Sequence, residues 1–209
     1  MLLDLKSLKE KYNLNITGVI HVGAHHGQEN TVYNELNIEN RIFFEPLKDS
    51  FEILKNNVSE QYTLYNFALG SENKKVTMNV ERNNQSQSSS ILVPKLHLTQ
   101  YPNIIFNETE EVNMVRLDDV NFDLNKYNFI MIDVQGYELE VFKGAEKTLQ
   151  KIDYIMSEIN RDELYENCAK IEELEVFLGH FGFKLVEENW AGGTWGDGFF
   201  IKKDKLNNV

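Results

Sequence analysis

The stretch Val19-Ile20-His21-Val22-Gly23-Ala24-His25-His26-Gly27 is a short run rich in β-branched residues that ends on a glycine, and a second glycine precedes a polar run compatible with a helix. This order predicts a strand, a tight turn and a helix, which is how an open α/β sheet presents its first strand to a ligand. Gly23 lets the backbone approach a bound molecule, and the amides of the following helix point at that molecule. A tight connection with no ligand fits these residues equally well.

Length and composition indicate one globular domain spanning residues 1–209. The chain has 209 residues, of which 42% are hydrophobic and 26% charged, enough to bury a core without disulfides. Cys168 is the only cysteine and cannot form an intramolecular disulfide, so we expect a reducing, cytoplasmic location. Charges interrupt the apolar residues near the N-terminus, and the apolar run 129–132 is too short to span a membrane.

The net charge restricts the class of partner. With 21 Lys and Arg against 33 Asp and Glu, the chain carries −12 at pH 7, a charge that repels the phosphates of nucleic acids. We therefore do not expect a DNA or RNA substrate. The sequence carries no signal for a particular oligomeric state.

Apolar runs alternate with amphipathic segments along most of the chain. Strands are expected at 19–23, 41–45, 62–67, 129–132, 153–158, 183–187 and 198–202, and helices at 1–12, 28–40, 48–58, 138–147 and 172–181. This alternation predicts an α/β fold with a mostly parallel seven-stranded sheet and helices on both faces. The link between the last two strands is short, so the final strand is expected to be antiparallel.

The alternation is interrupted in the middle of the chain. The segments 75–81 and 111–117 have the alternating pattern of exposed strands. Between them, residues 82–90 are polar and aperiodic, which favours a solvated, mobile loop. We therefore expect an insertion at about 75–117.

Glu45 strengthens the interpretation of the first turn as a ligand site. It follows Gly23 by 22 positions at the end of the second expected strand, where a doubly wound sheet places an acid against the hydroxyls of a ribose. The alternative is a solvated strand end before Pro46. A nicotinamide cofactor would normally require Gly-x-Gly-x-x-Gly, which is absent, as is the phosphate-binding Gly-Lys-Ser/Thr pattern. A ribose without a diphosphate suits S-adenosylmethionine.

The chain resembles the FkbM family of S-adenosylmethionine-dependent methyltransferases. The resemblance rests on motifs in the family's order, which are Val22-Gly23-Ala24-His25-His26-Gly27-Gln28, Phe44-Glu45-Pro46, Asn66-Phe67-Ala68-Leu69-Gly70, Ser88-Ser89-Ser90-Ile91, Leu117-Asp118-Asp119-Val120 and the run from Phe129 to Ala145. The family often has an acid where His21 stands, and commonly Asp-Val-Glu-Gly where this chain has Gln135. The resemblance implies a Rossmann-like, class I methyltransferase fold.

The resemblance also implies a set of cofactor contacts. Four residues of the first turn would wrap the methionine end: Gly23, Ala24, His25 and Gly27. Glu45 would hold the ribose, and Asn66, Phe67 and Ala68 would border the adenine. Asp133, at the end of the fourth parallel strand, would meet the methionine amine or the acceptor, unless it caps the following helix.

The expected reaction is transfer of a methyl group to a hydroxyl of a small-molecule or glycan acceptor, a saccharide or a secondary metabolite. The hydroxyl must lose a proton, and the candidate bases are Asp133, Glu138, His21, His25 and Glu158, with the first three expected to be catalytic. No metal is expected, because no ligand spacing supports one.

The acceptor side is expected to include the inserted region and a glycine-rich loop at 190–197. The residues expected there are Ser88, Ser89, Ser90, Trp190 and Trp195. The two tryptophans could stack on a sugar ring or pack in the core. Two other functions fit the same residues: a nucleoside-binding module without transfer activity, and a nicotinamide oxidoreductase.

Overall fold

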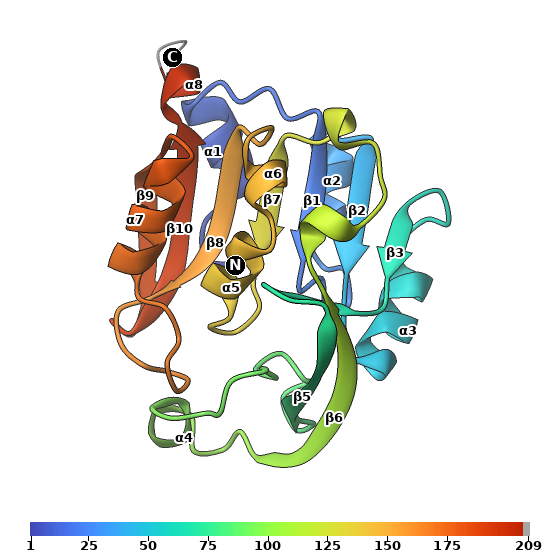
Figure 1. Cartoon of the computed structure of the whole chain (residues 1–209), viewed down its shortest axis with the longest axis vertical. Coiled ribbons are helices and arrows are strands. Elements are labelled where there is room, and N and C mark those ends of the chain that lie inside the picture. The colour runs from blue at the N-terminus through green and yellow to red at the C-terminus, as the bar shows by residue number, and fades with distance from the viewer. Residues whose placement is uncertain (207–209) are drawn as a thin grey trace.

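In the computed structural model, which describes residues 1–206, a seven-stranded sheet crosses the molecule (Figure 1). Its strands, in spatial order, are β3 (Thr63–Tyr65), β2 (Asn40–Phe44), β1 (Gly18–Val22), β7 (Phe129–Ile132), β8 (Tyr154–Asn160), β10 (Trp195–Lys202) and β9 (Phe183–Ala191). The first five are parallel, and β10 is antiparallel to both of its neighbours. The predicted fold class is confirmed.

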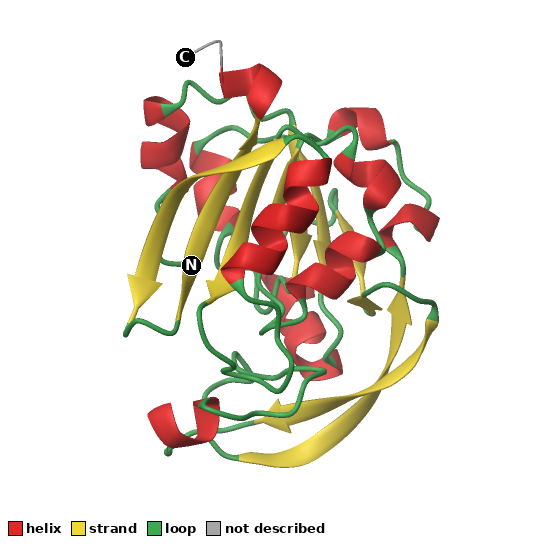
Figure 2. Ribbon diagram, turned by 60° about the vertical axis from the view of Figure 1, so that its left-hand side comes forward, coloured by secondary structure: helices red, strands yellow, loops and turns green. Residues whose placement is uncertain are grey.

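Helices cover both faces of this sheet (Figure 2). The helices are α1 (Leu5–Lys11), α2 (Asn30–Glu35), α3 (Lys48–Asn57), α4 (His97–Gln100), α5 (Glu138–Lys143), α6 (Glu146–Leu149), α7 (Ile171–His180) and α8 (Lys203–Leu206), with 3-10 turns at Leu117–Asp119 and Leu124–Lys126. Because side chains alternate along a strand, Val19 packs with α1, α2 and α3, whereas Ile20 packs with α5, α6 and α7. The four inner parallel strands, β2, β1, β7 and β8, are therefore buried on both faces, whereas the edge strand β3 is partly exposed.

A second, three-stranded sheet lies beside the carboxyl ends of the parallel strands (Figure 1). It contains β4 (Ala68–Leu69), β6 (Phe106–Val115) and β5 (Lys74–Glu81), in that order. The strands β5 and β6 are antiparallel and carry the segment 82–105 between them. The two exposed strands expected at 75–81 and 111–117 are present. Strand β4 was not expected, because two residues are too few to show a periodicity.

The helix expected over 138–147 is two helices, α5 and α6, separated at Gly144. A Cβ on Gly144 would lie 1.9 Å from the carbonyl oxygen of Gly70, so the backbones touch where the helix breaks. The apolar residues Leu139, Phe142 and Leu149 predicted one continuous helix because their spacing does not register this contact.

The loop expected over 190–197 is instead the end of a β-hairpin, in which Trp190 belongs to β9 and Trp195 to β10. Gly196 pairs with Trp190, and a Cβ on Gly196 would lie 2.1 Å from the carbonyl oxygen of Asn189. The glycine is needed for close approach of the strands, whereas its presence had indicated a loop.

No helix within residues 1–206 is long and apolar enough to cross a lipid bilayer.

Candidate functional site

Two adjoining cavities lie where the parallel strands end. The first, called the Glu45 cavity, is lined by strand ends and by apolar residues that include Phe67, Ala68 and Met78. The second, called the His21 cavity, has a volume of about 600 Å³, within the range of small-molecule sites. Both are lined by Gly23, His25, Gln87, Asp133 and Gln135.

The turn after β1 is fixed by its neighbours on both sides. The amides of Gly23 and Ala24 both donate to the carbonyl oxygen of Phe44, at 3.0 and 2.9 Å. Gly23 has φ +76°, and a Cβ there would lie 1.9 Å from the carbonyl oxygen of Asp133. Only glycine fits between β2 and the end of β7, so this turn brings the backbone to the edge of both cavities.

Glu45 is a buried carboxyl that lines the Glu45 cavity. Its side chain accepts hydrogen bonds from the amides of His25 (2.9 Å) and Leu47 (2.8 Å), and the residue is 5% exposed. Burial raises the pKa of Glu45 to about 7, against the lowering effect of these two amides. The alternative of a solvated strand end is therefore wrong.

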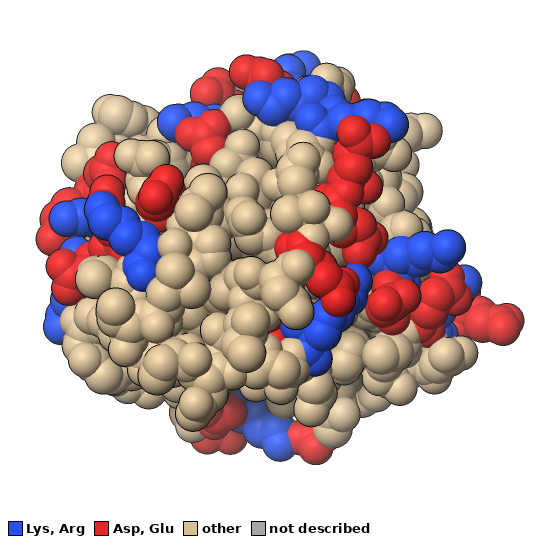
Figure 3. Space-filling view, turned by 90° about the horizontal axis from the view of Figure 1, so that it is seen from below, with Lys and Arg blue, Asp and Glu red and all other residues tan. Residues whose placement is uncertain are grey.

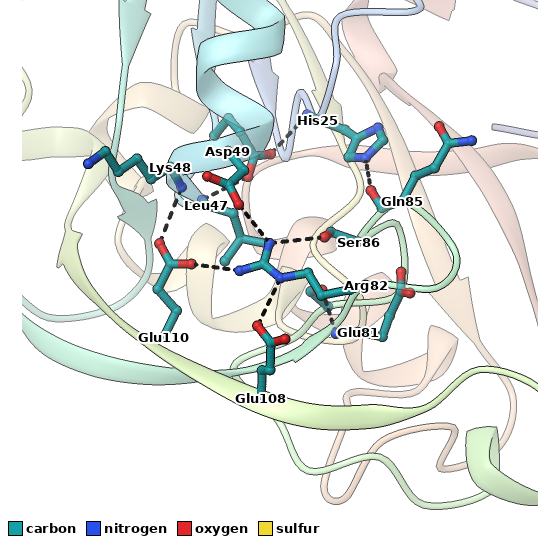
Figure 4. Close-up of polar contacts among 12 residues, drawn as sticks. His25, Leu47, Lys48, Asp49, Glu81, Arg82, Gln85, Ser86, Glu108 and Glu110 are labelled. Atoms are coloured by element: carbon teal, nitrogen blue, oxygen red, sulfur yellow. Dashed lines mark hydrogen bonds and ion pairs between the residues drawn. The ribbon is translucent and has the colours of Figure 1, made fainter.

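His25 holds the turn to the loop at 82–90. Its Nδ1 lies 2.9 Å from the side-chain nitrogen Nε2 of Gln28, which can only donate, so Nδ1 accepts and Nε2 of His25 carries the proton. Nε2 then donates to the carbonyl oxygen of Gln85, at 2.6 Å (Figure 4). With both ring nitrogens engaged, His25 has no free lone pair to act as a base.

The polar loop, residues 82–90, is ordered by charged side chains rather than solvated along its length. Arg82 contacts Asp49 at 3.5 Å, Glu108 at 3.1 Å and Glu110 at 3.4 Å, which joins the loop to α3 and β6 (Figure 4). At its start, the buried Glu81 accepts hydrogen bonds from the amides of Asn84 and Ser88.

The end of the polar loop is buried, contrary to the expectation of a solvated, mobile segment. Ser88, Ser89 and Ser90 are 7%, 6% and 0% exposed. The hydroxyl of Ser90 donates to the carbonyl oxygen of Gln135 at 2.7 Å, and the Tyr165 hydroxyl lies 2.7 Å from the carbonyl oxygen of Ser88. Composition indicated a solvated loop because it does not register these distant partners.

Three side chains meet where β7 ends beside Glu158 of β8. The side-chain nitrogen of Gln135 donates to Asp133 at 2.7 Å and to Glu158 at 2.7 Å. The side-chain oxygen of Gln135 lies 2.8 Å from the Tyr165 hydroxyl. Gln135, at the position where the resembled family commonly has a glutamate, thus places a neutral donor between two carboxyl groups.

His21 lies on β1 at the edge of the larger cavity. It is 2% exposed, its Nδ1 lies 3.2 Å from the Tyr33 hydroxyl, and its Nε2 is 4.0 Å from Glu29. Burial lowers the pKa of His21, although Glu29 and Asp133 raise it, so the ring is neutral at pH 7. A neutral ring can exchange hydrogen bonds with a ligand in the His21 cavity.

Glu138 supports the turn after β7 and lines neither cavity. It is 1% exposed and accepts hydrogen bonds from the amides of Val134 (3.0 Å) and Gly136 (3.2 Å). Burial raises the pKa of Glu138 to about 7. The N-cap position of α5 is occupied by Tyr137, so Asp133 is not the N-cap and the capping alternative is wrong.

The chain matches the FkbM methyltransferase domain over residues 21–185, most of its length. It belongs to the FkbM methyltransferase family. It is therefore an S-adenosylmethionine-dependent methyltransferase, and the expectations of that family, enzyme class and cofactor are confirmed. This family match rules against the nicotinamide oxidoreductase.

Known proteins similar to this FkbM methyltransferase include one curated relative. This relative, "2-O-methyltransferase NoeI" of Sinorhizobium fredii (strain NBRC 101917 / NGR234), is 27% identical to the present chain over 198 residues. The match covers 90% of this chain and 80% of that protein.

Solved structures of methyltransferases share the fold. The magnesium protoporphyrin IX methyltransferase ChlM of Synechocystis PCC 6803 has a TM-score of 0.53 at 8% identity, covering 95% of this chain and 80% of that chain. The ribosomal protein L11 methylase of Lactobacillus delbrueckii subsp. bulgaricus has a TM-score of 0.51 at 12% identity, covering 95% and 76%. At these identities the likeness concerns the fold alone.

The structure brings together most of the residues that the sequence indicated for the FkbM methyltransferase. The expected residues that line the Glu45 cavity are Gly23, His25, Glu45, Phe67, Ala68, Ser89 and Asp133. Those that line the His21 cavity are His21, Gly23, His25, Ser88, Asp133, Glu158 and Trp195. Neither cavity is lined by Ala24, Gly27, Asn66, Ser90, Glu138 or Trp190.

The expected residues that lie outside both cavities have contacts of their own. Gly27 approaches Leu54 of α3, and Asn66 donates to the carbonyl oxygens of Glu45 and Pro46, both at 2.9 Å. Trp190 stacks under Arg161, whose guanidinium carbon is 3.6 Å from the ring centroid. For Trp190 the packing alternative fits the structure better than sugar stacking.

Sequence reasoning missed the residues that the inserted segment and the loop after β8 add to the His21 cavity. His97 and Tyr101, on and beside α4, line the cavity, and Trp195 donates from its indole nitrogen to the Tyr101 hydroxyl at 2.7 Å. The backbone amide of His97 donates to Leu164, which also lines the cavity. No periodicity or motif marks these residues, because long-range contacts position them.

Within residues 1–206 there is no group of three or more His, Cys, Asp or Glu side chains placed to hold a metal ion.

Proposed function

We propose that the chain methylates a hydroxyl oxygen of a small, uncharged, polyhydroxylated acceptor, of the saccharide or secondary-metabolite class. The observation that carries the proposal is the sharing of Asp133 and Gly23 by two adjoining cavities, one for each reactant. The similarity to a protein named as a 2-O-methyltransferase supports a hydroxyl as the acceptor group.

The Glu45 cavity suits the adenosine end of the cofactor. A carboxylate has about four acceptor sites, and the amides of His25 and Leu47 use two of those on Glu45, which leaves sites for the hydroxyls of a ribose. The apolar wall at Phe67, Ala68 and Met78 suits a flat base. Gly23 would then face the methionine end, with Asp133 at the boundary between the two cavities.

The His21 cavity suits an uncharged acceptor. No Lys or Arg of the described chain lines either cavity, whereas Glu29, Asp133 and Glu158 line this one. Phosphate and carboxylate groups are normally held by Arg or Lys, so an anionic acceptor would be repelled. Trp195 and Tyr101 provide aromatic surface of the kind that packs against sugar rings.

A small acceptor also agrees with the outer surface. On the face seen from below, Lys and Arg stand beside Asp and Glu around a largely uncharged centre (Figure 3). Nucleic-acid binding draws its strength from clustered cations at phosphates, so this face favours a small acceptor over RNA or DNA.

When bound, S-adenosylmethionine supplies an activated methyl group on a positively charged sulfur. The residues of this chain would bind and align the two reactants, exclude water and accept the proton of the hydroxyl. Alignment alone can supply much of the rate enhancement, because reacting atoms held in line no longer need to meet by diffusion. Asp133 is the carboxyl group that both reactants can reach.

Two measurements test the proposal. Titration calorimetry with S-adenosylmethionine and S-adenosylhomocysteine should detect binding of both, and Glu45→Gln should weaken it. Incubation with an isotopically labelled methyl donor and a panel of neutral sugars, sugar phosphates and other hydroxyl compounds should label neutral members only. Labelling confined to phosphorylated or carboxylated members would refute the assignment of the acceptor.

A further inference from the structure

The side chains of Asp133 and Gln135, just after β7, form a bridge with that of Glu158 on β8. The amide nitrogen of Gln135 has two N–H bonds, and each is directed to a different carboxyl group at 2.7 Å. Glu158 is 2% exposed, and its second oxygen, Oε1, has no hydrogen-bond partner within residues 1–206. The two carboxyl groups therefore lie close together with a single neutral donor between them.

The surroundings of this pair disfavour two negative charges. Glu138 on α5 and Asp197 on β10 are further carboxyl groups facing Glu158, and the nearest imidazole, His21, is neutral. Burial, reinforced by Asp133, Glu138 and Asp197, raises the pKa of Glu158 well above its usual range. Asp133 is half-buried and Glu158 is buried, and two carboxyl groups that share a site without a cation between them disfavour ionisation of the second, so Glu158 retains a proton.

We propose that Asp133 and Glu158 share one proton, held mainly by Glu158, and that Asp133 receives the proton of the acceptor hydroxyl. This inference rests on the proposed function, because it takes the His21 cavity as the acceptor side. Asp133 lines both cavities, whereas Glu158 lines only the His21 cavity. Asp133 is then the catalytic residue, and Glu158 and Gln135 are positioning residues.

The proton balance of the step is simple. The O–H bond of the acceptor breaks, its proton binds Asp133, and the electron pair stays on the acceptor oxygen, which becomes the nucleophile. After methylation Asp133 returns its proton to solvent through the His21 cavity, and the pair is again singly protonated. The step consumes no co-reactant beyond the two substrates.

The two carboxyl groups fix the orientation of the bridge, because carboxylate oxygens accept and so face the side-chain nitrogen of Gln135. The Tyr165 hydroxyl lies on the other side, 2.8 Å from the side-chain oxygen of Gln135 and 2.7 Å from the carbonyl oxygen of Ser88. Gln135 is held in the left-handed region at φ +56°. A glutamate here would add a third carboxyl and remove the donor, so Gln135→Glu should raise the number of protons that the cluster retains at pH 7.

The shared proton can be measured without any acceptor. In the full chain labelled with ¹³C at the Glu and Asp carboxyls, NMR titration from pH 4 to 9 should show a Glu158 signal still protonated at pH 7. That signal should be absent from Glu158→Gln and should titrate at lower pH in Asp133→Asn. The exposed Glu60→Gln should leave it unchanged. A Glu158 signal that is ionised at pH 6 alongside Asp133 would overturn the shared proton.

The catalytic part is tested with whichever acceptor the labelling panel identifies. Asp133→Asn removes the proton acceptor and should lower kcat at least about tenfold, and Asp133→Glu should recover part of that loss. Glu158→Gln imitates the protonated side chain, so it should shift the pH profile of kcat while the affinity for S-adenosylhomocysteine stays within about twofold. An unchanged kcat in Asp133→Asn would overturn the role of Asp133. Failure to bind S-adenosylhomocysteine would refute the proposed function instead, and the NMR titration would still decide the shared proton.

Discussion

The turn after β1 and the polar loop at 82–90 face each other across the Glu45 cavity, and different interactions hold them in place. The turn is fixed by backbone contacts: Gly23 donates to Phe44 and lies against the carbonyl oxygen of Asp133. The loop is fixed by side chains, above all by Arg82 with its three acidic partners. The backbone contacts of the turn leave little room for a substitution. The exposed ion pairs of the loop contribute little free energy, so the loop can move at low cost.

Gly23→Ala should have the largest effect. The new Cβ would lie 1.9 Å from a carbonyl oxygen, and the residue would be held at φ +76°, so the ends of β1 and β7 must separate. We expect a loss of about 3 kcal/mol in the free energy of unfolding, with loss of S-adenosylhomocysteine binding. Urea denaturation and calorimetry measure the two effects. Gly192→Ala, at a glycine of positive φ with nothing within 4 Å, is the control for the conformational cost alone.

The pH dependence of the free energy of unfolding tests the burial of Glu45 against the turn after β1. The pKa of Glu45 is about 7 in the folded chain, against 4.5 for a free carboxyl. Between these values the folded state binds a proton that the unfolded state has lost, so this group's contribution to stability falls as pH rises from 4.5 to 7.

Glu45→Gln removes this titration, so the variant should gain stability relative to wild type across that window, by at most about 3 kcal/mol. The difference between the two proteins is the quantity to measure, because buried His21 titrates in the opposite sense. Urea denaturation at half-unit steps of pH gives it. A constant difference from pH 4.5 to 8 would show that Glu45 titrates normally.

The same variant should weaken cofactor binding. Glu45→Gln keeps the shape of the side chain but replaces one acceptor oxygen and the charge, and hydrogen bonds to a charged group contribute about 1.5–3 kcal/mol each. We expect at least about a tenfold loss of affinity for S-adenosylhomocysteine by calorimetry. Unchanged affinity, in a variant with a normal melting curve, would remove Glu45 from the ribose role.

Arg82→Ala should have the smallest effect and should act on the polar loop alone. Its ion pairs are exposed, so the expected loss in stability is below about 1 kcal/mol. Because the loop contributes Ser86 and Gln87 to the Glu45 cavity, we expect S-adenosylhomocysteine to dissociate about threefold faster in stopped-flow measurements. Lys75→Ala, which removes an exposed ion pair with Glu111 from the same hairpin, is the matched control. Equal effects of the two variants would contradict a specific role for Arg82.

The comparison also explains which parts of the molecule could be predicted from the sequence. The structure of the turn after β1 follows from local sequence. The β-branched runs imply strands, Gly23 implies a turn, and Glu45 implies a carboxyl group at a strand end. Most of the residues expected at the cofactor do line the cavity for this reason. Ala24 and Gly27 lie in the same motif but outside the cavity, because a motif indicates a turn and not the direction of each side chain.

The position of the polar loop at 82–90 depends on contacts between residues far apart in the sequence. Composition alone marks 82–90 as solvated, yet Ser90 is buried because its hydroxyl reaches Gln135. His97 and Tyr101 reach the larger cavity only because the inserted segment folds back over the loop after β8. Neither contact leaves a periodic pattern, so the sequence predicted an insertion but not its role at the site.

The contact between Gly70 and Gly144 lies directly behind β4, whose residues line the Glu45 cavity. A Cβ on Gly144 would meet the carbonyl oxygen of Gly70, and a Cβ on Gly70 would lie 2.3 Å from the sulfur of Met114 on β6. The small sheet thus rests directly on the break between two helices, and its height is set by two missing side chains. Because Ala68 and Leu69 of β4 line the Glu45 cavity, a methyl group on either glycine would press on a wall of that cavity from outside it, so protein engineers could alter the cavity's shape without changing a residue that lines it.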